Sequence, residues 1–193
     1  MWTLLKNQYK GVWEILKRYW SFYGGLSAIL LSPYFHASVL FALSMTHYWL
    51  YCPWWDVALS ALPTILGFTL AGFTIWLGFG DEKFQRLISM TSNDKKPSAY
   101  MGVSSGFAHF VIVQITAFLT ALWAKGANFT LPKGHWLVDY MSWLAPVGNF
   151  IGFMFFVYAI MTALAAMLGV FRAASWYDRH RQISKPTDAS NEE

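Results

Sequence analysis

The chain has 193 residues and a formal net charge of +4, and only 12% of its residues are charged while 56% are hydrophobic. A soluble domain carries roughly 25% charged residues. The charges leave four long uncharged stretches, at 19–55, 57–80, 97–124 and 140–171. Because a membrane-spanning helix needs about 20 mostly apolar residues, this pattern excludes a soluble globular protein. It predicts an all-α fold, a four-transmembrane-helix bundle. Cys52 is the sole cysteine, which also excludes chemistry that needs a cysteine pair.

An amphipathic helix is expected over residues 1–23. Apolar residues recur there at steps of three and four from Trp2 to Trp20, and basic residues occupy the remaining surface. A Trp- and Leu-rich face opposite lysines suits a helix that lies in the headgroup layer of a membrane. The alternative is a solvated helix that packs on a partner.

A four-helix membrane domain is expected over residues 24–182. Its spans are predicted within 26–51 and at 55–79, 98–124 and 141–171, the last continuing as a helix to about 181. Pro33 falls early in the first of these, so that helix either starts near Ser32 or kinks at Pro33. A short helix near 82–91, N-capped by Asp81, is expected between the second and third spans. The tail, 183–193, is polar and predicted to be disordered.

Lysine and arginine gather in three segments of the chain. Four precede the first span, four lie between the second and third spans, and four follow the fourth span, against none and two in the other connections. Basic residues favour the cytoplasmic side of a membrane. We therefore expect a multi-pass protein of the cell inner membrane with both termini in the cytoplasm.

Small residues within the spans are candidates for helix contacts. Residues of this size let helix backbones approach closely, either within one chain or between subunits, and we expect a homo-oligomer. Alternatively, the second span lines a hydrophobic pore that is gated by dewetting. The candidate packing or pore residues are Gly67, Ala71, Gly72, Gly78, Gly102, Gly106, Gly148 and Gly152.

Charged residues at the predicted cytoplasmic ends of the spans form a candidate docking surface. Such residues can bind a cytosolic protein partner or anionic lipid. The alternative for the short helix is that it simply turns along the membrane surface. The candidate docking residues are Asp81, Glu82, Lys83, Arg86, Lys95, Lys96, Arg172, Arg179 and Arg181.

Three histidines, His36, His47 and His109, lie within the predicted spans. Histidine is a common axial ligand of haem, which suggests a b-type cytochrome. His36 and His47 are about 16 Å apart along a helix, too far to bind one iron, so the ligands would come from different helices. The alternative is that these histidines pack with hydrogen bonds, as Gln114 and Asn149 are expected to do between helices.

The sequence predicts no enzyme. The run Gly102–Gly106 matches G-x-S-x-G, but it opens a predicted membrane helix and lacks the strand that a nucleophile elbow requires. No Asp or Glu lies deep within a predicted span, which argues against a proton-coupled transporter. We expect no cofactor, no bound metal and no direct nucleic-acid binding.

The run Gly67–Phe84 resembles a pattern found in small bacterial inner-membrane proteins. It is similar in style to the four-span membrane components of anti-phage defence systems such as the membrane subunit of Kiwa. The resemblance covers roughly a tenth of the chain, together with the span count and length. It implies an oligomeric scaffold or sensor in antiviral defence that recruits a cytosolic partner. The alternatives are a channel or membrane-permeabilising pore lined by the second span, and a b-type haem electron carrier.

Overall fold

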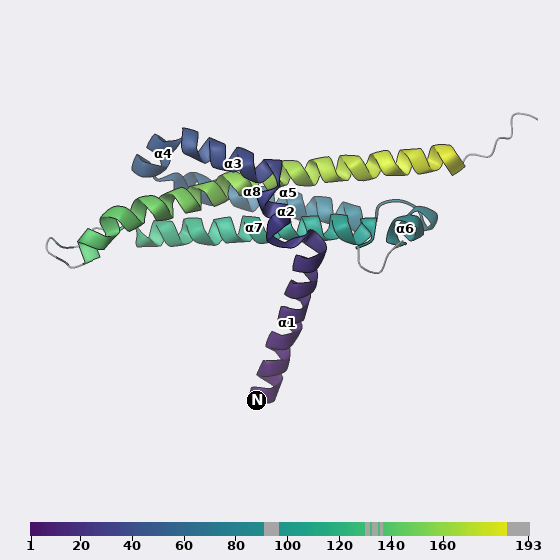
Figure 1. Ribbon diagram of the computed structural model, residues 1–193, viewed down its shortest axis with the longest axis horizontal. Helices are drawn as coiled ribbons and strands as arrows, with labels where there is room; N and C mark the ends of the chain where they lie inside the picture. The colour runs from purple at the N-terminus through teal and green to yellow at the C-terminus, as the bar shows by residue number, and fades with distance from the viewer. Residues whose placement is uncertain (91–96, 130–131, 133–134, 136, 185–193) are drawn as a thin grey trace, which may run out of the picture.

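The computed structural model describes residues 1–90, 97–129, 132, 135 and 137–184, and the regular elements in these ranges are all α-helices, as predicted. Figure 1 shows their arrangement. The helices are α1 (Trp2–Tyr23), α2 (Gly25–Leu30), α3 (Pro33–Ser44), α4 (Thr46–Tyr51), α5 (Trp54–Leu77), α6 (Glu82–Ser89), α7 (Ala99–Ala127) and α8 (Leu137–Ser184).

Within the described residues, three helices are long and apolar enough to cross a membrane. They are α5, α7 and the Tyr140–Ile183 part of α8, with 24, 29 and 44 residues. At 1.5 Å per residue even α5 is about 36 Å long, more than the hydrocarbon thickness of about 30 Å. The second, third and fourth expected spans therefore each correspond to a single long helix of a membrane protein, although the second was predicted two residues past the end of α5 and the third one residue before the start of α7.

The region of the first expected span, 26–51, consists of three short helices, α2, α3 and α4. Pro33 lacks a backbone N–H and cannot continue a preceding helix, so a new helix begins at it. Ser32, just before it, has an extended backbone with ψ 126°. A second break falls at Met45. Across it, the Trp49 indole N–H donates to the Ala42 carbonyl oxygen at 2.8 Å. The break at Pro33 was predicted and the break at Met45 was not, and within the described residues only α5, α7 and α8 are long and apolar enough to cross a membrane.

The bundle is built from α5, α7 and α8, which pack against one another, with α3 and α4 packed along α8 (Figure 1). We call its two ends the α4 end and the α6 end. Near the α4 end, Trp54, Leu62 and Phe153 are almost fully buried, and nearer the α6 end Trp76 and Phe107 are. The two clusters follow the length of the bundle, so both halves have a packed interior.

Helix α1 confirms the predicted N-terminal helix and runs crosswise to the long helices (Figure 1). The corner between α1 and α2 is formed by Gly24 and Gly25, whose φ angles are 102° and 67°. Side chains rarely adopt this left-handed backbone, so the corner depends on glycine. The two glycines thereby set the direction in which α1 leaves the bundle.

The connections differ from the predicted ones in detail. Helix α6 ends at Ser89, two residues before the expected end at 91. The predicted tail, 183–193, begins with Ile183 and Ser184, which are the last residues of α8, and the rest of it lies outside the described residues. Lys95 and Lys96 lie outside them as well.

Candidate functional site

Helix α6 packs beside α7, and a buried aromatic side chain joins it to the end of α8. Asp81 caps it as predicted, because its carboxylate Oδ1 accepts a hydrogen bond from the Phe84 backbone N–H at 2.8 Å. The Phe84 side chain is 1% exposed, and its ring meets Tyr177 and His180 of α8 at centroid distances of 5.1 and 5.7 Å. The apolar side of α6 that carries Phe84 is thus buried, and its exposed side carries charged residues.

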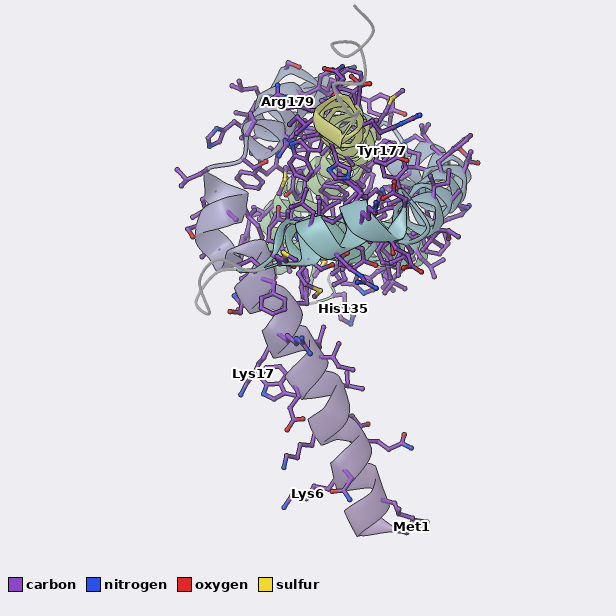
Figure 2. The ribbon with its side chains drawn as sticks, turned by 90° about the vertical axis from the view of Figure 1, so that its right-hand side faces the viewer. Met1, Lys6, Lys17, His135, Tyr177 and Arg179 are labelled. Atoms are coloured by element: carbon purple, nitrogen blue, oxygen red, sulfur yellow. The ribbon has the colours of Figure 1, made fainter. Side chains whose placement is uncertain are left out.

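We call Asp81, α6 and residues 171–184 of α8 the charged platform. Figure 2 looks onto this end of the molecule, with Tyr177 and Arg179 on α8. Glu82 and Arg86 form an exposed ion pair at 3.6 Å, which adds little to stability. The predicted docking residues that the structure places here are all exposed: Asp81, Glu82, Lys83, Arg86, Arg172, Arg179 and Arg181.

A second cluster joins α1 to the interior of the bundle. His109 is 3% exposed, and its two ring nitrogens bond to two tyrosine hydroxyls: Nδ1 to Tyr19 at 2.8 Å and Nε2 to Tyr158 at 3.0 Å. The Tyr23 ring stacks on His109 with centroids 3.9 Å apart. We call these four residues the Tyr–His cluster. It connects α1, α7 and α8 through residues far apart in the chain.

Either tautomer of His109 satisfies the cluster, because each phenol can donate or accept a hydrogen bond. Burial, with a further contribution from Tyr23, raises the pKa of Tyr19 to about 12, so its hydroxyl keeps its proton at neutral pH. The sequence reasoning missed Tyr19, Tyr23 and Tyr158. The spacing of four between Tyr19 and Tyr23, which places both on one face of α1, was the available signal.

The three histidines that suggested haem are not brought together. His36 on α3 and His47 on α4 are exposed, whereas His109 is buried with both nitrogens hydrogen-bonded to tyrosines. Within the described residues no group of three or more His, Cys, Asp or Glu side chains could hold a metal ion. Gln114 and Asn149 do bond between helices as predicted, Gln114 donating to Thr69 and Asn149 accepting from Trp54.

The candidate glycines fall into three groups. A Cβ on Gly152 would lie 2.7 Å from the Trp54 ring, and one on Gly72 would lie 3.5 Å from Phe107, so these two allow close packing within the chain. A Cβ on Gly106 would meet only Phe110 of its own helix, at 3.8 Å. Around the positions of the remaining glycines a Cβ would meet nothing within 4 Å: Gly67, Gly78, Gly102 and Gly148.

One face of α5 carries only small residues and is open. Its members follow the helical repeat and are all exposed: Ser60, Thr64, Gly67, Ala71, Thr74 and Gly78. We call them the α5 stripe. Positions that face lipid tails are usually large and apolar, while small residues favour contact with another helix. The stripe contains Gly67, Ala71 and Gly78 of the predicted set, and Gly72 is directed elsewhere.

Comparison of the chain with protein-family models, with curated proteins and with solved structures gave no match.

Proposed function

We propose that this chain is a non-enzymatic, oligomeric scaffold or sensor of a bacterial inner membrane. It recruits a cytosolic protein through the charged platform. The resemblance of Gly67–Phe84 to Kiwa-type membrane proteins suggests anti-phage defence as the process that this partner serves.

The observation that carries the proposal is the aromatic contact of α6 with α8, a helix long enough to extend well beyond a bilayer. Helix α8 has 48 residues. It is therefore about 72 Å long, more than twice the hydrocarbon thickness. The aromatic contacts of Phe84 hold α6 against this extension, which gives a folded surface instead of a loose loop. A preorganised charged surface of this kind favours recognition of an oppositely charged partner.

The distribution of cations supports a cytoplasmic platform. Five basic residues lie on the platform: Lys83, Arg86, Arg172, Arg179 and Arg181. At the α4 end, Lys125 is paired with Asp56 at 2.9 Å. Cations near span ends favour the cytoplasmic side, so this asymmetry favours the α6 end as the cytoplasmic one.

Reversing four platform charges should abolish partner binding. The variant combines Lys83→Glu, Arg86→Glu, Arg179→Glu and Arg181→Glu, all exposed positions, so the fold should persist. We expect affinity purification from the native host in mild detergent to recover a stoichiometric soluble protein with the wild-type chain and not with the variant. The mass of the recovered complex measures this.

A charge swap at the α4 end, Asp56→Lys with Lys125→Asp, is the matched control and should keep the partner. Recovery of the same partner with the reversed platform would contradict the proposal.

The α5 stripe favours a second function, an oligomeric pore lined by α5. If copies of the chain surround an axis, the hydroxyls of Ser60, Thr64 and Thr74 would lie along it. Replacing Gly67 by leucine should then narrow the pore and reduce single-channel conductance in planar bilayers. Gly102→Leu on α7, where a Cβ also meets nothing within 4 Å, should leave conductance unchanged. Bilayers that stay silent with the wild-type oligomer would rule out the pore.

A further inference from the structure

Helix α1 carries an apolar face that the rest of the chain does not cover. Tyr9, Val12 and Trp13 are 71%, 58% and 59% exposed. The helix contacts the bundle through Tyr19 and Tyr23 near its C-terminal end, and most of its length extends away from it (Figures 1 and 2). Exposure of these apolar side chains to water is unfavourable, so α1 needs an apolar environment that covers them.

The opposite face of α1 is basic. Lys6, Lys10, Lys17 and Arg18 stand against one acid, Glu14. Lys10 and Glu14 are 4.0 Å apart, and the Lys17 ammonium lies 5.4 Å from the Trp13 ring, at the edge between the two faces. Lysines at such an edge keep their charge in the polar layer while their stems cover apolar surface. The excess of positive charge complements an anionic surface.

The place where α1 leaves the bundle suits a membrane surface. Trp76 is one residue from the end of α5, and its indole N–H donates to the Ser104 hydroxyl, so Ser104 of α7 is level with that end of α5. His109, which bonds to Tyr19, lies five residues further along α7, about 8 Å from this level. Interfacial helices bury their apolar face to a depth of about 5–10 Å. Because α1 runs crosswise to helices that can cross the membrane, its length follows the membrane plane (Figure 1).

We infer that α1 is an arm that binds anionic lipid. Its apolar face enters the leaflet at the α6 end, its lysines contact the phosphates of anionic headgroups, and the Tyr–His cluster fixes the end of the arm to the bundle. This inference does not depend on the charged platform or on its partner.

Spin labels on the two faces of α1 test the inference in the full chain. In a Cys52→Ser background, one label is placed by Val12→Cys on the apolar face and another by Asn7→Cys on the polar face, both exposed positions. The chains are reconstituted in discs of phosphatidylcholine with or without phosphatidylglycerol. Collision with oxygen reports immersion in lipid tails, and collision with a water-soluble nickel chelate reports exposure to water.

With phosphatidylglycerol we expect the Val12 label to collide with oxygen and to be shielded from nickel, and the Asn7 label to show the reverse. In pure phosphatidylcholine, and in the triple variant Lys6→Gln, Lys10→Gln and Lys17→Gln, the contrast between the two labels should shrink. Lys125→Gln, which removes a cation at the α4 end, should leave it intact.

Three results would overturn the inference. The first is equal nickel access at both positions with phosphatidylglycerol, and the second is the same contrast in both lipids. The third is a Val12 label shielded from both collision partners, which would indicate contact with protein instead of lipid. The exposed labelling positions keep the test independent of folding, because neither substitution touches the interior.

Discussion

Replacing Gly152 by alanine should destabilise the bundle by about 1–3 kcal/mol, the usual cost of inserting a methyl group into a packed core. Trp54 is fully buried against this glycine, and two of its ring carbons lie 2.7 and 2.8 Å from where the alanine Cβ would be. The indole N–H also donates to Asn149 Oδ1 at 3.3 Å, so the ring cannot move away without weakening that bond. Helix α8 must therefore shift away from α5.

Gly148→Ala is the matched control, one turn earlier on the same helix, because a Cβ there meets nothing within 4 Å. Alanine is the better helix former, so this variant should be neutral or more stable by up to about 1 kcal/mol. Unfolding titrations with sodium dodecyl sulfate in detergent micelles, followed by circular dichroism, compare the two. Coincident midpoints for the two variants would show that Trp54 does not need the space at Gly152.

Phe84→Ala should release α6 from the charged platform. Truncation of a buried phenylalanine costs about 3–5 kcal/mol. The side chain is 1% exposed and packs against Tyr177 and Phe79 at centroid distances of 5.1 and 6.2 Å. Helix α6 has eight residues, fewer than the roughly 12–15 that an isolated helix needs to be even marginally stable. The substitution should therefore unfold α6 and leave the other helices folded.

Hydrogen exchange followed by mass spectrometry measures this release. Amides of residues 82–89 should lose their protection in Phe84→Ala, while α5 and α7 keep theirs. Leu87→Ala removes a side chain that is 52% exposed on the same helix and should keep the protection. Unchanged protection in Phe84→Ala would mean that α6 is held by something else. Because this variant keeps every platform charge, loss of the partner in it would show that the fold of the platform matters.

Local signals predicted the long helices and the cap of α6. Runs of apolar residues longer than a bilayer is thick leave few alternatives to α5, α7 and α8. Asp81 before an amphipathic run is a sequence signature of a helix start, and it is realised in the hydrogen bond to the Phe84 N–H. Both features depend on residues close together in the chain.

Other features depend on tertiary contacts and could not be predicted in this way. Gly148 and Gly152 are equivalent in the sequence pattern, and only the packing of α8 on α5 decides which of them faces Trp54. The helix break at Met45 has no proline or glycine beside it that would have predicted it. The Tyr–His cluster joins residues 90 and 49 positions apart, so the spacing of Tyr19 and Tyr23 indicates a shared face of α1 but not their partners on α7 and α8.

The division of residues 25–51 into three short helices has a consequence for biogenesis. Helices α3 and α4 pack mainly on α8, which is the last of the described helices in chain order. During synthesis, α3 and α4 therefore cannot pack on α8 until α5 and α7 have been made. Correct seating of the earliest segment is a late event, and a ribosome that stalls before α8 leaves α3 and α4 without the surface against which they pack.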